Sequence, residues 1–355
     1  MAASPSPARP GGTDTPDQAL ARGRWVKLIC GAGNQDLAAI EDLCAIYALA
    51  GVHCIDVAAD AAVAAAARRG MAWAERQGAP RPWLMLSLSD GDDPHFRKAG
   101  FDPQRCPAAC PRPCQRVCPA DAIGEGGGVI AERCYGCGRC LPACPLGLIE
   151  ERQVLLSPEV VPELLREVQP DAVELHTQVG RAAGFGARLQ QLQRSGVPLR
   201  RLAVSCGLER AAGSGTAGAN LPPRELADAL WQRFRALRGA GYSPLWQLDG
   251  RPMSGDVGAG TAHAAVKLLR AVRPWAPPGP LQLAGGTNGH TLPLLAPEDG
   301  AAGVAFGGVA RSLLQPLLRQ AELAGRPLRE LPELRDQALT LARELLTPWL
   351  QRLDG

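Results

Sequence analysis

Short apolar runs alternate with amphipathic helical segments along most of this 355-residue chain, and this alternation limits the folds open to it more than any other feature. The pattern is typical of βαβ units, in which helices join parallel strands. Eight strands with intervening helices predict an α/β fold of the TIM type, a (β/α)₈ barrel. An open doubly wound sheet of eight strands is the alternative, because periodicity does not show whether a sheet closes. The predicted strands are 26–30, 54–58, 83–88, 172–176, 202–206, 245–248, 281–284 and 303–306.

The repeating pattern begins late and breaks once, which divides the chain into four segments. Residues 1–24 are rich in Pro, Gly, Ser and Thr and are predicted to be a disordered tail. Residues 25–97 form the first part of the barrel, and residues 98–150, dense in Cys, Pro and Gly, are predicted to be a ferredoxin-like insertion. Residues 151–355 complete the barrel and its C-terminal helices. The amphipathic stretch at 328–353 is expected to be a helix that packs on the barrel or presents a partner surface.

Eight of the twelve cysteines fall within the insertion, and their spacing is that of iron-sulfur ligands. The second run reads C-x₂-C-x₂-C-x₃-C-P, which in two-cluster ferredoxins supplies three thiolates to one [4Fe–4S] cluster and the fourth to its neighbour. The first run has three residues in every gap, and its prolines exclude a regular helix. The runs comprise Cys106, Cys110, Cys114 and Cys118, followed by Cys134, Cys137, Cys140 and Cys144.

Both runs end in Cys-Pro, which suggests an internal duplication and a crossed assignment of ligands. The wider spacing of the first run leaves a three-iron [3Fe–4S] cluster as the alternative at the first site. Two zinc sites or disulfides are disfavoured, because structural zinc uses separated cysteine pairs and the cytosol is reducing. The crossed assignment gives cluster one Cys106, Cys110, Cys114 and Cys144, and gives cluster two Cys134, Cys137, Cys140 and Cys118.

Glycine-rich loops follow the last three predicted strands, at the end of a barrel where functional loops lie. Backbone N–H groups of such loops, with a helix N-terminus, can hold a phosphate, so FMN or a phosphorylated metabolite is a candidate ligand. Tight turns without a ligand are the alternative, and the chain has no Gly-Lys-Ser/Thr motif of the Walker type. The candidate glycines are Gly255, Gly258 and Gly260, then Gly285 and Gly286, then Gly307 and Gly308.

Polar residues at the predicted strand ends do not identify a catalytic residue. Alternation puts Glu174 and His176 on one face of their strand, where a satisfied interior pair and an acid/base pair both remain open. Cys206, at the end of its strand, is the best candidate among the remaining cysteines for more than a buried apolar role. Asp56, Asp249 and Asp256 also follow strands, Cys30, Cys44 and Cys54 are expected to be buried, and His53, His95, His263 and His290 show no metal-binding spacing.

Composition narrows the classes of function. A net charge of +3 and an aromatic content of 4% provide neither the positive surface nor the stacking platform that nucleic acid requires. No apolar run approaches the roughly 20 residues needed to cross a bilayer, and the N-terminus lacks the apolar core of a secretion signal. We therefore expect a cytoplasmic protein without a membrane span.

Three long stretches, together with the paired cysteine runs, carry a family resemblance. They are VKLICGAGNQDLAAIEDLCAIYALAGVHCIDVAAD at 26–60, QLDGRPMSGDVGAGT at 247–261 and LAGGTNG at 283–289. Over roughly residues 25–320 the chain resembles the cyanobacterial light-dependent period (LdpA) family. The resemblance implies an iron-sulfur protein that relays cellular redox state, and hence light intensity, to the circadian clock. It also implies association with the histidine kinases CikA and SasA and the oscillator protein KaiA.

A second class of function remains open. The barrel would bind FMN or a phosphorylated substrate, and the clusters would feed it electrons, which makes the protein an iron-sulfur oxidoreductase. The glycine loops motivate this alternative. A simple ferredoxin-like carrier is disfavoured, because electron transfer alone does not need a barrel.

Overall fold

Residues 14–124, 126, 128–208, 221–251 and 258–352 are described by the structure, a computed structural model of the chain. Within them, parallel strands close into a barrel in the order β1-β10-β9-β8-β7-β6-β3-β2. Closure confirms the predicted (β/α)₈ fold and excludes the open sheet. Each predicted strand is present, with ends that move by at most one residue. The barrel strands are β1 (Trp25–Ile29), β2 (Cys54–Ala58), β3 (Trp83–Ser89), β6 (Ala172–His176), β7 (Arg201–Cys206), β8 (Pro244–Asp249), β9 (Leu281–Ala284) and β10 (Gly303–Phe306).

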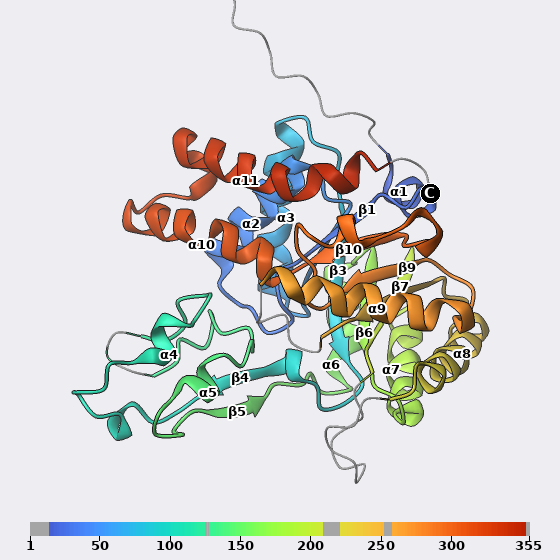
Figure 1. Cartoon of the computed structure of the whole chain (residues 1–355), viewed down its shortest axis with the longest axis horizontal. Coiled ribbons are helices and arrows are strands. Elements are labelled where there is room, and N and C mark those ends of the chain that lie inside the picture. The colour runs from blue at the N-terminus through green and yellow to red at the C-terminus, as the bar shows by residue number, and fades with distance from the viewer. Residues whose placement is uncertain (1–13, 125, 127, 209–220, 252–257, 353–355) are drawn as a thin grey trace, which may run out of the picture.

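Helices cover the outside of the barrel (Figure 1). An aspartate caps the N-terminus of each of the first two barrel helices, which follow β1 and β2. The carboxylates of Asp36 and Asp60 accept hydrogen bonds from backbone N–H groups in the first turn of these helices. The C-terminal helix packs against its neighbours α2 and α10, burying Leu346 and Trp349 on the barrel side. The helices are α2 (Leu37–Ala50), α3 (Ala61–Arg76), α6 (Val160–Val168), α7 (Ala182–Ser195), α8 (Pro223–Gly239), α9 (Ala262–Val272), α10 (Gly308–Leu323) and α11 (Pro332–Leu350).

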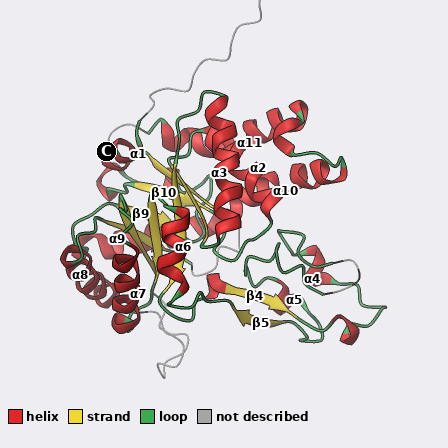
Figure 2. Cartoon of the chain, turned by 180° about the vertical axis from the view of Figure 1, so that it is seen from behind, coloured by secondary structure: helices red, strands yellow, loops and turns green. Residues whose placement is uncertain are grey.

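Between β3 and α6 the chain leaves the barrel, and an antiparallel ribbon marks its exit and return. β4 (Arg97–Gly100) pairs with β5 (Glu150–Gln153). Two short helices, α4 (Pro113–Arg116) and α5 (Cys140–Ala143), lie between these strands. Figures 1 and 2 show the segment as a smaller lobe beside the barrel. We call residues 97–153 the cysteine lobe.

A short helix lies in the segment that composition predicts to be disordered. α1 (Pro16–Ala21) begins with a capping box, in which Thr15 and Gln18 each accept the other's backbone N–H. Ala19 and Leu20 are buried at the N-terminal end of the barrel. The prediction of a disordered tail through residue 24 is therefore wrong for this helix, because a cap and two apolar contacts do not register in average composition. Residues 1–13 of the predicted tail lie outside the described residues.

His53 provides a pH test of the N-terminal end of the barrel. Its Nδ1 accepts the Val26 amide at 3.1 Å, and burial lowers its pKa from 6.5 to about 4, with Asp14 raising it and Arg24 lowering it further. The unfolded chain takes up this proton near pH 6.5 and the folded chain only near pH 4, so stability is lost as pH falls through that window, by up to about 3 kcal/mol.

We expect His53→Asn to reduce this acid sensitivity, because the asparagine Oδ1 replaces the Nδ1 acceptor and takes up no proton. Denaturant unfolding of both proteins at about pH 7 and about pH 4.5 measures the effect. Equal losses of unfolding free energy in the two proteins would contradict the assignment.

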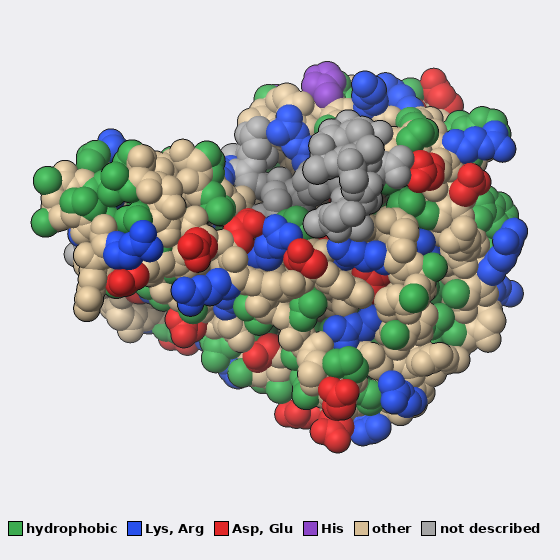
Figure 3. Space-filling model, turned by 90° about the horizontal axis from the view of Figure 1, so that it is seen from below, with side chains coloured by type: hydrophobic (Ala, Val, Ile, Leu, Met, Phe, Trp, Pro, Cys, Tyr) green, Lys and Arg blue, Asp and Glu red, His purple; other side chains and the backbone are tan. Residues whose placement is uncertain are grey.

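Basic and acidic side chains alternate over the face of the molecule shown in Figure 3. This mixture accords with the net charge of +3. In the described ranges, the structure contains no helix with the length and apolar character to cross a membrane.

Candidate metal centre and barrel mouth

Four of the clustered cysteines line one cavity in the cysteine lobe, with an empty volume of about 450 Å³. Its other walls are largely apolar and include Ile123, Val129 and Leu141. Two of its sulfurs already accept backbone N–H groups, from Ala99 to Cys134 at 3.3 Å and from Ala122 to Cys118 at 3.2 Å. Hydrogen bonds of this kind stabilise the thiolate form of a cysteine. The four cysteines are Cys118, Cys134, Cys137 and Cys140.

A glycine allows the second cysteine run to turn tightly against the ribbon. Gly136 has a φ of 77°, which L side chains rarely adopt. A Cβ on Gly136 would lie 2.2 Å from the Arg97 carbonyl oxygen. The loop between Cys134 and Cys137 can therefore approach β4 only with glycine at this position.

The remaining clustered cysteines lie elsewhere in the lobe. Cys114 is buried, and burial is the largest cause that raises its pKa. Cys144 packs against the same small apolar cluster as Cys114. Cys110 is half-buried in a turn. All twelve cysteines lie in the described residues, and each is a free thiol.

Polar contacts join the cysteine lobe to the barrel helices. The Lys98 ammonium on β4 donates to the Gln35 side chain, just before α2, at 2.6 Å. On the other side, Arg319 of α10 donates to the Asp121 carboxylate at 3.0 Å. The lobe is thus held to α10 and to the segment just before α2.

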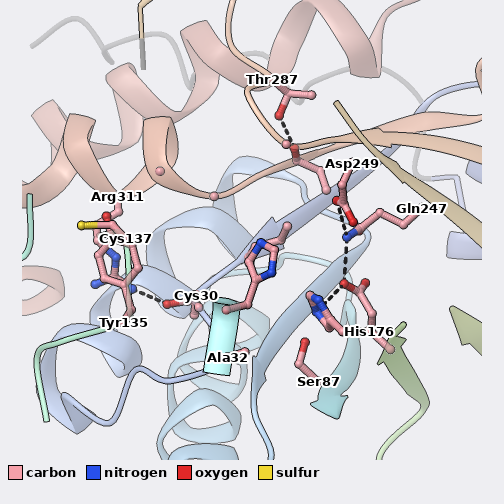
Figure 4. A pocket seen from close by; sticks show the side chains of 18 of the residues that line it. Cys30, Ala32, Ser87, Tyr135, Cys137, His176, Gln247, Asp249, Thr287 and Arg311 are labelled. Atoms are coloured by element: carbon pink, nitrogen blue, oxygen red, sulfur yellow. Dashed lines mark hydrogen bonds and ion pairs between the residues drawn. The ribbon is translucent and has the colours of Figure 1, made fainter. Parts of the chain in front are cut away.

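A second cavity, with an empty volume of about 820 Å³, lies at the C-terminal ends of the barrel strands. The cysteine lobe closes one side of it with Tyr135 and Cys137 (Figure 4). The Arg311 guanidinium lies 4.8 Å from the centre of the Tyr135 ring and donates to the Cys30 carbonyl. Cys137 also lines the cavity of four cysteines, so the two cavities share this side chain.

Buried polar side chains connect the barrel interior to this mouth. The Lys27 ammonium pairs with Asp56 at 3.1 Å and also with Glu174. Glu174 Oε1 lies 3.0 Å from His176 Nε2 and 2.8 Å from Gln247 Nε2. These side chains come from β1, β2, β6 and β8 and point inward, because alternate residues of a barrel strand face the interior. Figure 4 shows the part of this hydrogen-bonded network nearest the barrel mouth, where Gln247 also donates to Asp249 and His176 lies beside it.

Charge pairing fixes the protonation of these groups. Burial lowers the pKa of Lys27, but the charges of Asp56 and Glu174 outweigh it and keep that pKa above its usual range. Burial raises the pKa of Glu174, but the Lys27 charge and the His176 hydrogen bond lower it further than burial raises it. For His176, burial lowers the pKa and the contact with Glu174 raises it to about 9. The Glu174–His176 pair is therefore a satisfied ion pair, which favours the first of the two interpretations open for it.

The predicted glycine loops reach the barrel mouth only in part. Gly258 and Gly260 are exposed, and neither lines the cavity. Gly285 has a φ of 64°, and a Cβ there would lie 2.3 Å from the Arg251 carbonyl oxygen. This close backbone packing is sufficient to require glycine, with or without a bound ligand. Gly255 and Asp256 lie outside the described residues. The glycines that line the cavity are Gly285, Gly286, Gly307 and Gly308.

The sequence indicates no role for His95, but the structure places it beside His176 at the barrel mouth. His95 lies on a short turn, Pro94–Phe96, and its ring is 4.9 Å from that of His176. Its Nδ1 contacts Asp93 Oδ1 at 2.8 Å. Spacing alone did not reveal the pair, because His176 is far away in sequence. The usable signal was an Asp-x-His, Asp93 to His95, in the loop that follows a barrel strand.

The four cysteines outside the lobe are buried, as expected. Cys206 lines a further cavity beside the barrel mouth, next to His176. Burial raises its pKa to about 12, so the thiol stays protonated and is a poor nucleophile.

Solved structures resemble the whole chain only weakly. The carboxyl transferase domain of Rhizobium etli pyruvate carboxylase has a TM-score of 0.42 and 12% identity, covering 93% of this chain and 49% of that chain. A putative fructose-1,6-biphosphate aldolase from Coccidioides immitis has a TM-score of 0.42 and 10% identity, covering 92% of this chain and 91% of that chain. Similarity at this level does not bear on ligand or reaction.

Sequence relationships are much closer. Residues 106–155 match the LdpA Fe-S cluster-binding domain, and residues 164–348 match the light dependent period A C-terminal domain. The first match contains all eight clustered cysteines. The curated protein light dependent period A from Synechococcus elongatus is 47% identical over 350 residues, covering 96% of this chain and 95% of that protein. The chain therefore belongs to the light dependent period A family and carries its iron-sulfur cluster-binding domain.

Proposed function

We propose that this protein is a redox sensor that reports cellular redox state, and with it light intensity, to the circadian clock. The position of Cys137 carries the proposal, because this side chain lines both the four-cysteine cavity and the barrel mouth. A charge at the sulfur is only weakly screened in a mostly buried site. A change in charge at the four thiolates therefore acts on the contents of the barrel mouth.

The donor set fits two iron-sulfur clusters, and the fit supports the crossed ligand pattern. Apolar walls, backbone N–H donors to sulfur and free thiols are the surroundings that such clusters need. We propose [4Fe–4S] at both sites. Bound clusters supply reversible exchange of single electrons. Cluster one would be held by Cys106, Cys110, Cys114 and Cys144, and cluster two by Cys118, Cys134, Cys137 and Cys140.

Helix α10 makes several of the contacts between the cysteine lobe and the barrel. Tyr135, between two proposed ligands of cluster two, lies against Arg311 of α10. Asp121, three residues after the proposed ligand Cys118, pairs with Arg319 on the same helix. We propose that α10 and the adjoining α2 form the surface that meets clock input proteins in the cytoplasm. By family membership, CikA, SasA and KaiA are the candidates.

Cys137→Ser tests the proposal in a cyanobacterial strain whose own copy of the gene is replaced. We expect cluster two to be lost and the clock period to become the same in dim and bright light. Cys54→Ala is the control, because it removes a buried thiol outside the lobe and should preserve both properties. A protein that has lost the cluster while the period still follows light intensity would disprove sensing through this site.

An oxidoreductase is the second candidate, favoured by the glycines that line the barrel-mouth cavity and by the charged side chains beneath it. In this case the cavity would hold FMN or a phosphorylated substrate. Anaerobically purified protein should then release a yellow flavin on denaturation, or bind added FMN. A protein that releases no flavin and binds none counts against this function and leaves the sensor proposal intact.

A further inference from the structure

A carboxylate and two imidazoles meet at the C-terminal ends of two neighbouring strands. β3 and β6 pair side by side, with Ser89 opposite His176. The chain turns immediately after β3 and presents Asp93 and His95 toward His176. One ligand atom from each of these three residues can be chosen so that all lie within 4.8 Å of one another. Two histidines and one carboxylate are a common donor set for divalent transition metals.

Surrounding groups already orient the donors as an outer shell orients metal ligands. Glu174 Oε1 contacts His176 Nε2 at 3.0 Å, which leaves Nδ1 as the second ring nitrogen of His176. Ser205 Oγ lies 3.5 Å from that Nδ1, which is long for a hydrogen bond. Metal-binding histidines usually donate their other N–H to a carboxylate, as His176 does here. The Asp93 carboxylate is held by the His95 amide at 2.9 Å.

The surroundings of His176 are rich in carboxylates. Glu174 contacts its ring at 3.0 Å, Asp93 belongs to the same cluster of three residues, and Asp249 lines the same two cavities as His176. Lys27 pairs with Glu174 but is not paired with the other two. A bound divalent cation would interact favourably with the carboxylates of Asp93 and Asp249, which Lys27 does not reach.

The three residues also border open space. His95 and His176 line both the barrel-mouth cavity and the cavity beside it, and Asp93 lines the second. Three protein ligands leave coordination positions for water or a small anionic ligand entering from either side. We propose that Asp93, His95 and His176 bind one divalent first-row transition-metal ion, distinct from the metal centres of the cysteine lobe.

Mn²⁺ binding to the anaerobically purified full-length protein tests the site, since Mn²⁺ does not replace the iron of the clusters. Loss of the electron paramagnetic resonance signal of free Mn²⁺ reports binding. We expect one tight site per chain, with Zn²⁺ displacing Mn²⁺ mole for mole. His95→Ala should weaken binding by at least about 100-fold, since removing even an outer-shell partner costs about 10- to 100-fold. Asp93→Asn, which preserves shape, should weaken it in the same direction.

His263→Ala is the matched control, because His263 is exposed and lies outside the site. Unchanged visible absorbance of the clusters shows that each variant is folded. A wild-type protein that binds no Mn²⁺ at millimolar concentration would overturn the proposal. Equal Mn²⁺ affinity in wild type, His95→Ala and Asp93→Asn would overturn it equally.

Discussion

Replacing Cys118 and Cys140 together with alanine is expected to cost the protein no more iron than either replacement alone. In the crossed pattern both residues hold cluster two, so the second replacement meets a site that is already lost. Replacing Cys140 and Cys144 together should remove nearly all the iron, because these neighbours in sequence serve different clusters. Wild type should carry about eight iron atoms per chain and each single variant about four.

Iron and sulfide analysis of anaerobically purified protein measures these differences directly. Non-additivity is the informative quantity, since residues that act as one unit show it and independent residues do not. An uncrossed arrangement, in which each run serves its own cluster, predicts the reverse, with Cys140 and Cys144 non-additive and Cys118 and Cys140 additive. Far-UV circular dichroism confirms that each variant keeps its barrel.

The barrel and the cysteine runs were both predictable, because each depends on short-range periodicity. Strands of a parallel barrel are apolar on both faces and are separated by helices with one apolar stripe, so their positions can be read along the chain. The cysteine spacing is equally local. Closure of the sheet was inferred from the count of eight strands and is confirmed by the pairing of β1 with β10.

Features that depend on contacts between distant segments could not be predicted. His95 carries no metal-binding spacing because its partner His176 belongs to a strand that is its neighbour only in the folded barrel. The same holds for Cys137, whose place between two cavities follows from how the lobe docks on α10 rather than from its own run. The buried position of Lys27 was also missed, because a single lysine in an apolar run gives no indication of the carboxylates it will meet.

Lys27→Met should be the most destabilising single change in the barrel interior. Methionine fills a similar volume but leaves the Asp56 and Glu174 carboxylates buried without their cation. Removing one partner of a buried ion pair typically costs about 3–5 kcal/mol of unfolding free energy, far more than the pair itself contributes. Denaturant unfolding near neutral pH, followed by circular dichroism under anaerobic conditions, measures the loss.

Arg81→Met is the matched control, because Arg81 pairs with Asp171 at 3.5 Å with its side chain 54% exposed. Such a pair should be worth less than about 1 kcal/mol. Adding Glu174→Gln to Lys27→Met should recover part of the loss, since it removes one of the two uncompensated charges. A cost for Lys27→Met as small as that of Arg81→Met would mean that Asp56 and Glu174 are not ionised in the folded protein. Lys27 would then not be the group that keeps Glu174 charged, and the orientation of His176 at the barrel mouth would need a different cause.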